Sequence, residues 1–297
     1  MRLACLQMAG VLGDVEGNIS RANALLEAAK PTDLDLLMLP ELAFSGYNHP
    51  SLAAITPYLE PTSAGPSTRW AVDTARRLRC HVSVGYPEIV AAGTSSTDAP
   101  VHYNAVVLVS PDGAVVMHYR KRYLYYTDET WAKEGDADFS TQRVTGLDHD
   151  VTMGICMDLN TYRFEPPYDR YDFSTQATMS HASLVLMTMA WLSPRETAWP
   201  ADEVPHPDND TIAYWLWRLT PLAQARGQDE VIVVLCNRSG IEGEAHYAGS
   251  SAVMGMKDGE VTVYGVLGRG VEELLVADTT VKRGTIVREA FTVPVGE

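Results

Sequence analysis

The sequence has few basic residues, few cysteines and no long apolar run. Its 23 Lys and Arg stand against 38 Asp and Glu, a formal charge of −15, so it lacks the cationic surface on which nucleic-acid binding depends. Its four cysteines lie far apart without a Cys-x-x-Cys pair, which argues against a zinc site or disulfide framework and favours a reducing compartment. No apolar run reaches the roughly 18 residues of a membrane span. We expect a cytoplasmic protein that binds neither nucleic acid nor membranes.

What is present is a chain of 297 residues, of which 46% are hydrophobic, as in ordinary soluble globular proteins. Short β-rich runs alternate with helical patterns, which predicts an α/β fold. No stretch resembles a domain linker, so we expect one domain over residues 1–297. The predicted strands cover 2–8, 34–39, 82–86, 103–109, 115–120, 151–156, 184–189, 231–236, 251–256, 261–266 and 273–276.

Helix and turn signals complete this outline. Asn18 is a candidate N-cap for a first helix, and a second helix is predicted over residues 67–79. Asp210 is a candidate cap for a third helix, which Pro221 should kink or restart. The sequence Ser-Pro-Asp-Gly at 110–113 predicts a hairpin turn between two strands.

Cys156 is the cysteine best placed for chemistry. It ends the β-run VTMGIC and enters a turn-like segment, a position that can expose a sulfur while a strand holds it rigid. The alternative is a small, buried, inert side chain, which we expect for the other three cysteines. None of the eight histidines stands in a motif that would make it the base for a thiol nucleophile.

Two charged residues also stand at strand ends. Glu41 follows the apolar run DLDLLMLP and precedes a glycine-containing loop. Lys121 ends VVMHYR and precedes the aromatic stretch YLYYTDE, where its ammonium would be desolvated. Taken singly, each could be an ordinary exposed residue at the end of a strand.

Together these three segments resemble the carbon-nitrogen hydrolase, or nitrilase, superfamily. LPELAFSGY is similar to its catalytic-glutamate segment, HYRKRYL to its catalytic-lysine segment and GICMDLN to its nucleophile segment, in the family's order and with similar spacing. The flanking segments RLACLQMAG, YNAVVLVSPDG, LVLMTMAWL and YAGSSAVM match other family blocks, so the resemblance spans nearly the whole chain.

The resemblance implies a four-layer αββα sandwich of two mixed β-sheets with a Glu-Lys-Cys triad at the strand ends. Cys156 would be the nucleophile, Glu41 the general base, and Lys121 the cation that stabilises the tetrahedral oxyanion. The Met157 backbone N–H would complete the oxyanion hole. A thioester intermediate would then be hydrolysed by water, with no metal or organic cofactor.

Many members of the superfamily carry a second glutamate beyond the lysine, which orients that lysine. Glu129 is the candidate here, and Glu134 is the alternative. The sequence departs from the common pattern at Tyr123, where a histidine is frequent, which puts the assignment of this loop in doubt more than the triad.

Within the superfamily, RKRYLYYTDETW, GICMDLNTYRFEPPYD and NRSGIEGEAHYAGSS most resemble the eukaryotic protein N-terminal amidases. That branch deamidates an N-terminal Asn or Gln side chain in the Arg/N-degron pathway, so the expected partner is a peptide or protein with a free N-terminal Asn or Gln. The substrate α-ammonium calls for a carboxylate, and Asp158 and Asp128 are the candidates, although either could instead cap a helix or a turn.

Aromatic residues could line the walls of the expected site, namely Tyr125, Tyr126, Tyr162 and Trp191. Two other functions stay open: a small-molecule aliphatic amidase or carbamoylase with the same triad, and a non-catalytic binding module. Retention of all three triad residues argues against the binding module. Related proteins often form dimers, so a homodimer is possible.

Overall fold

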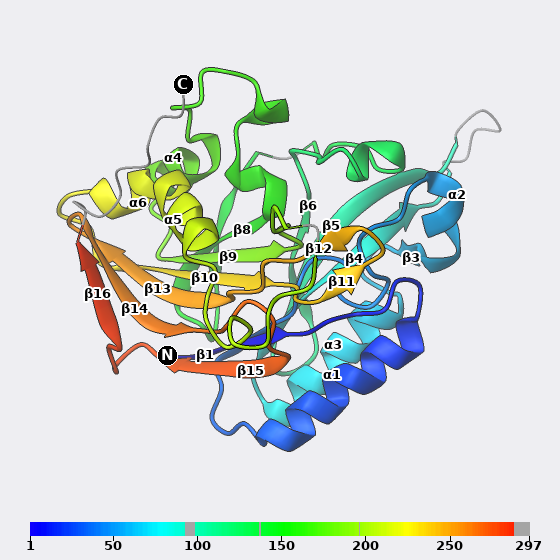
Figure 1. The fold of residues 1–297 in the computed structure, drawn as a ribbon, viewed down its shortest axis with the longest axis horizontal. Coiled ribbons are helices and arrows are strands. Elements are labelled where there is room, and N and C mark those ends of the chain that lie inside the picture. Colours follow the sequence, from blue (N-terminus) through cyan, green and yellow to red (C-terminus); the bar gives the residue numbers. More distant parts are fainter. Residues whose placement is uncertain (93–98, 137, 196, 288–297) are drawn as a thin grey trace.

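The computed structural model describes residues 1–297 except 93–98, 137, 196 and 288–297. Two seven-stranded mixed sheets dominate it, in the orders β15-β1-β2-β4-β5-β6, with β3 beside β4, and β16-β14-β13-β10-β9-β8-β7 (Figure 1). The first sheet comprises β1 (Arg2–Gln7), β2 (Leu36–Met38), β3 (Glu60–Pro61), β4 (His81–Val90), β5 (Val101–Val109), β6 (Val115–Arg120) and β15 (Glu273–Asp278). The second comprises β7 (Thr141–Val144), β8 (His149–Ile155), β9 (Leu184–Met189), β10 (Val231–Asn237), β13 (Ala252–Lys257), β14 (Glu260–Val266) and β16 (Gly284–Val287).

Helices cover the outer faces of both sheets, which gives the predicted αββα sandwich (Figure 1). The long helices α1 (Val15–Ala29) and α3 (Pro66–Leu78) lie on the first sheet, and α4 (Asp172–Met179), α5 (Asn209–Arg218) and α6 (Thr220–Gln224) on the second. The remaining elements are short: α2 (Leu52–Ile55), β11 (Ile241–Glu242) paired with β12 (Ala245–His246), and the 3₁₀ turns η1 (Thr56–Tyr58), η2 (Asp128–Thr130), η3 (Cys156–Leu159) and η4 (Tyr162–Phe164).

Strand β1 shows how the layers form. Side chains alternate across a strand, so Leu3 and Cys5 join the core between the two sheets, whereas Ala4 and Leu6 join the core beneath α1 and α3. Both faces of β1 are therefore apolar, as expected for a strand buried on two sides. Its neighbours are β2, parallel, and β15, antiparallel, so strands that are about 270 residues apart in sequence pair in one sheet.

All eleven predicted strands are confirmed, although β2 is three residues long rather than six. The structure adds β3, β7, β11, β12 and β16, which the sequence did not reveal because they are two to four residues long. The hairpin at 110–113 is confirmed, since β5 and β6 pair antiparallel and the Ser110 N–H donates to Ala114 O at 2.8 Å.

Two predicted helix caps are wrong. Asp14, rather than Asn18, caps α1 by accepting from Gly17 N, and Asp208, rather than Asp210, caps α5 by accepting from Thr211 N. In both places a better-placed aspartate stands two to four residues upstream, and it takes the orphan N–H groups of the first turn. Pro221 does restart the helix, at the start of α6.

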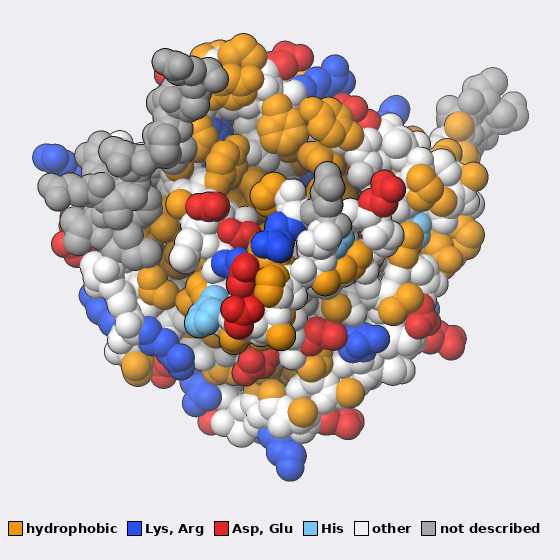
Figure 2. All heavy atoms as spheres, viewed as in Figure 1, with side chains coloured by type: hydrophobic (Ala, Val, Ile, Leu, Met, Phe, Trp, Pro, Cys, Tyr) orange, Lys and Arg blue, Asp and Glu red, His pale blue; other side chains and the backbone are white. Residues whose placement is uncertain are grey.

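Exposed large hydrophobic side chains include several from the segment between β6 and β9. Tyr126, Tyr162, Tyr168 and Met179 are among them, and hydrophobic side chains gather on the upper part of the face shown in Figure 2. Charged side chains of both signs are interspersed with them lower on that face. Among the residues that the structure describes, no helix is long and apolar enough to cross a membrane.

Asn18 has a role other than the predicted one, and it yields the first testable prediction. Its buried side chain donates to Val11 O at 2.7 Å and to Phe44 O at 2.8 Å, and accepts from Val11 N at 2.8 Å. Asn18→Ala leaves the buried Phe44 carbonyl and the partly buried backbone groups of Val11 without this partner, and should lower the free energy of unfolding by about 3 kcal/mol in urea titrations. The exposed α1 variant Glu27→Ala is the control, and equal stability of the two variants would contradict the assignment.

Candidate active site

Three of the predicted site residues stand at strand ends that converge. Glu41 follows β2, Lys121 directly follows β6, and Cys156 directly follows β8 as the first residue of η3. The carboxylate and the ammonium are fully buried and the thiol is 8% exposed. The two sheets thus bring together residues that are far apart in sequence.

Lys121 is the centre of a buried ionic cluster. Its Nζ lies 2.6 Å from Glu41 Oε1 and 2.6 Å from Asp128 Oδ2. Asn104, on β5, donates through Nδ2 to the same two carboxylates, at 2.7 Å to Glu41 and 2.9 Å to Asp128. The Tyr47 hydroxyl also donates to Asp128, at 3.2 Å. Two carboxylates therefore face one ammonium, a net charge of −1 when all three groups are ionised.

Burial and neighbouring charges set the protonation of this cluster. Burial raises the pKa of Glu41 above its usual value, although Lys121 opposes the rise. Burial alone would lower the pKa of Lys121, but Asp128 and Glu41 reverse this and hold it above its usual value. Burial, reinforced by Glu41, raises the pKa of the Cys156 thiol, and Lys121 opposes that rise. Cys156 is thus a resting thiol that needs a base, and Glu41 Oε2 has no hydrogen-bond partner among the described residues.

The backbone at Cys156 is unusual. Its φ is +41°, in the left-handed region that non-glycine residues rarely adopt and that often marks functional sites. A hydrogen bond from the Ala190 backbone N–H, at the end of β9, acts to lower the thiol pKa. The sulfur is therefore held by the ends of two adjacent parallel strands, β8 and β9.

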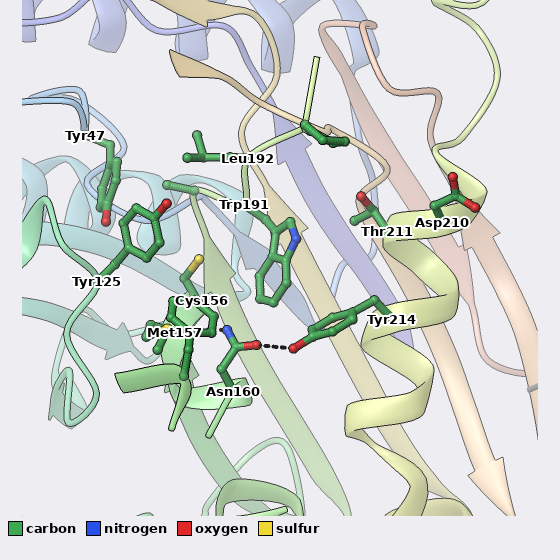
Figure 3. Close-up of a pocket in the computed structure, with 13 residues that line it drawn as sticks. Tyr47, Tyr125, Cys156, Met157, Asn160, Trp191, Leu192, Asp210, Thr211 and Tyr214 are labelled. Carbon is green, nitrogen blue, oxygen red and sulfur yellow. Dashed lines mark hydrogen bonds between the residues drawn. The ribbon is translucent and has the colours of Figure 1, made fainter. Parts of the chain in front are cut away.

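Cys156 lies in a cavity of about 410 Å³ whose walls include five aromatic residues. Figure 3 shows its sulfur between the rings of Tyr125 and Trp191. That volume suits a small ligand or the end of a peptide. The other residues that line the cavity are Tyr47, Met157, Asn160, Phe164, Ala190, Leu192, Pro194, Asp210, Thr211 and Tyr214.

The Trp191 wall is rigid. Asn237 Oδ1 accepts from Trp191 N at 2.7 Å and its Nδ2 donates to Trp191 O at 3.3 Å, which fixes the backbone. The indole packs edge-on against Trp215, with ring centroids 5.9 Å apart, and beside Tyr214, at 5.5 Å. The cavity therefore presents a preorganised aromatic face next to the sulfur.

The second carboxylate that pairs with Lys121, beside that of Glu41, belongs to Asp128 and not to the predicted Glu129. The Glu129 side chain is 41% exposed and faces Arg163, at 3.8 Å. The alternative, Glu134, accepts from the Tyr162 hydroxyl at 2.7 Å and makes no contact with Lys121. Of the three side chains in the short turn η2, only that of Asp128, its first residue, is buried.

Neither predicted carboxylate is free to bind a substrate α-ammonium. Asp158 is fully buried and accepts from Tyr123 N, Ile155 N and the Tyr119 hydroxyl, each at 2.8 Å. It ties the segment after Lys121 to the strand before Cys156, and burial raises its pKa to about 6. Asp128 is committed to Lys121. The bond from Ile155 N is the capping role that the sequence left open for Asp158, whereas the bond from Tyr123 N comes from a distant segment.

Of the other predicted cavity residues, Tyr125, Trp191 and Met157 line the cavity, and the role of the Met157 N–H stays a prediction. Tyr126 is 62% exposed and packs on Tyr125 instead, with ring centroids 5.0 Å apart. The sequence reasoning missed Asn104, although an asparagine within the apolar run NAVVLV signals a buried polar group that needs partners. In the part of the chain that the structure describes, no group of His, Cys, Asp and Glu could hold a metal ion.

Comparison with known proteins agrees with this geometry. The family model for carbon-nitrogen hydrolases matches residues 2–163. A protein N-terminal amidase of Schizosaccharomyces pombe is 30% identical over 90% of this chain and 95% of its own length. A Saccharomyces cerevisiae protein of the same name is 29% identical over 65% of this chain and 45% of its own length.

Solved structures share the fold. A crystal structure of an N-terminal amidase superposes with a TM-score of 0.80 over 97% of this chain and 99% of that one, at 20% identity. Another, with a Gln-Gly peptide, gives 0.79 over 93% and 96%, also at 20% identity. The match to the family model, together with the relative that is similar over almost its full length, shows that this chain belongs to the carbon-nitrogen hydrolase family.

Proposed function

We propose that the protein hydrolyses the side-chain carboxamide of an N-terminal Asn or Gln in peptides or proteins and releases ammonia. One observation carries this proposal: Cys156 lines a cavity of about 410 Å³ and interacts electrostatically with the buried Glu41–Lys121–Asp128 cluster. The printed name of the S. pombe relative, protein N-terminal amidase, supports the choice of amide. The cytoplasmic location stays a prediction.

In the proposed reaction Glu41 takes the thiol proton of Cys156 as the sulfur attacks the carboxamide carbon. The negative charge that develops on the carbonyl oxygen is stabilised by the Lys121 ammonium and the Met157 N–H. Glu41 returns the proton to the leaving nitrogen, the C–N bond breaks, and ammonia departs from a thioester. Water, deprotonated by Glu41, then attacks the thioester and regenerates the thiol and a side-chain carboxylic acid.

The substrate α-ammonium would meet a favourable field without a dedicated carboxylate. When all three of its groups are ionised the buried cluster carries a net charge of −1, and low local polarity extends its effect into the cavity. Asp210, the one acidic residue among the described residues that line the cavity, lies beyond Trp191 and Tyr214 as seen from Cys156 (Figure 3). The indole face of Trp191 beside the sulfur is the surface suited to a cation.

A peptide panel tests the function. Peptides that begin with Asn or Gln should gain about one dalton and release ammonia, because an amide becomes an acid. Free asparagine, simple aliphatic amides and N-acetylated peptides should react much more slowly, and Cys156→Ala should be inactive while remaining folded. Faster hydrolysis of simple amides than of the peptides would favour a small-molecule amidase, and unchanged turnover by Cys156→Ala would exclude the covalent route.

The pH profile tests the base. Because Glu41 must be ionised and burial raises its pKa, kcat/KM should fall on acidification with a midpoint above the value of about 4.3 for a free glutamate. Asp158 has a pKa of about 6, so its titration could also produce a fall in kcat/KM on acidification. Asp158→Asn should keep the same acid limb. A limb at or below pH 4.3, or one that disappears in Asp158→Asn, would contradict the role of Glu41.

Trp191→Leu tests recognition of the amine. For an Asn peptide, kcat/KM should fall about tenfold, the scale of a desolvated cation–π contact. For the matched peptide with the α-amine replaced by hydrogen, it should change little. Trp199→Leu is the control, since the described cavity lining does not include Trp199. Equal losses on both substrates would show that Trp191 only shapes the cavity.

A further inference from the structure

A second buried ion pair lies behind the cluster, in the part of the chain beyond the family match. Arg238 directly follows β10, and Glu242 ends β11. Both side chains are 1% exposed, and the guanidinium pairs with the carboxylate. Neither residue lines the cavity described above.

The pair holds both ends of the loop that carries Glu41. Arg238 Nη1 donates to Glu41 O at 3.1 Å and to Leu42 O at 2.9 Å. At the other end, Glu242 Oε2 accepts from Tyr47 N at 2.9 Å and from Asn48 N at 3.0 Å. The cation thus binds carbonyl groups and the anion binds N–H groups, so each charge suits its end of the loop.

The backbone between these anchors needs such support. Leu42 has a φ of +44°, in the left-handed region that costs a non-glycine residue about 1 kcal/mol or more. Space for the guanidinium is provided by Gly10, where a Cβ would lie 2.5 Å from Arg238 Nη2. The loop conformation and the site of Arg238 are therefore mutually dependent.

Both anchored ends lead directly into the cluster. One is Glu41 itself, and the other is Tyr47, whose hydroxyl donates to Asp128 at 3.2 Å. A buried ion pair is weak support for stability alone, because desolvation offsets much of the attraction. Its hydrogen bonds to this loop point to a role in geometry.

We propose that Arg238 and Glu242 are positioning residues that set the place of the Glu41 carboxylate relative to the Cys156 sulfur. The inference rests on the proposed function for its turnover readout only. Arg238→Lys keeps the charge but loses the planar fork that reaches two carbonyls and a carboxylate. A displacement of about 1 Å can cost about 100-fold in rate.

The chain offers a matched control in Arg269. Its guanidinium also binds two carbonyls, His206 O at 3.1 Å and Pro207 O at 2.7 Å, and one carboxylate, Glu203 at 2.7 Å. It has no hydrogen bond to the loop that carries Glu41. Arg269→Lys therefore loses an equivalent set of contacts elsewhere.

The experiment measures two rates at several pH values: turnover of an Asn peptide, and alkylation of Cys156 by iodoacetamide followed by peptide mass spectrometry. Arg238→Lys should lose about 100-fold in kcat with KM within about threefold, and its alkylation rate should approach that of Glu41→Gln. Glu242→Gln should show a smaller loss of the same kind. Arg269→Lys should keep both rates whatever its melting temperature.

Wild-type rates in Arg238→Lys, or equal losses of rate in Arg238→Lys and Arg269→Lys, would contradict the proposal. Arg238 and Glu242 would then have only a structural role. If Arg238→Lys does not fold, Glu242→Gln decides, because its amide oxygen can still accept from the backbone. Failure of the wild type to deamidate Asn peptides would refute the proposed function alone, since the alkylation rates would still report the position of Glu41.

Discussion

The ammonium of Lys121 between two carboxylates is the interaction on which the site depends. Each charge is fully buried, and none could remain there alone, because desolvating an unpaired ion costs several kcal/mol. The attraction therefore fixes three segments at once: the loop after β2, the end of β6 and the turn η2. Asn104 completes the arrangement by donating to both carboxylates.

The second sheet carries the Cys156 thiol and supports the residues around it. The ends of β8 and β9 hold the Cys156 sulfur, and the end of β10 carries Asn237, which holds Trp191, next to Arg238, which holds the Glu41 loop. A sandwich in which these strands end on the same side thus gives each reacting group a rigid support. The strand ends then fix the positions of the reacting groups, and the loops beyond them determine the shape of the cavity.

Much of this could be predicted from sequence. Apolar, β-branched runs revealed every strand of six residues or more, and the motif order led to Glu41, Lys121 and Cys156, which the structure brings close together. Asp128 could not be told from Glu129, because neighbouring residues in a 3₁₀ turn point in different directions and a turn of three residues has no periodic pattern. For Asp158 the sequence left open a cap or an ammonium-binding carboxylate. The structure shows the cap, and the second N–H group that occupies Asp158 comes from Tyr123, more than thirty residues away, where no sequence pattern could reveal it.

The reacting groups come from the first portion of the chain, whereas both portions contribute to the walls of the cavity, the first through residues such as Tyr47 and Tyr125. Glu41, Lys121, Asp128 and Cys156 all fall within residues 2–163, whereas Trp191, Thr211 and Tyr214 come later. Substitutions at Trp191, Thr211 or Tyr214 change the wall of the cavity without removing a reacting group. A lineage that keeps the first portion could therefore change its preferred amide by drift in β9, α5 and their connection, which would explain how one chemistry serves many substrates.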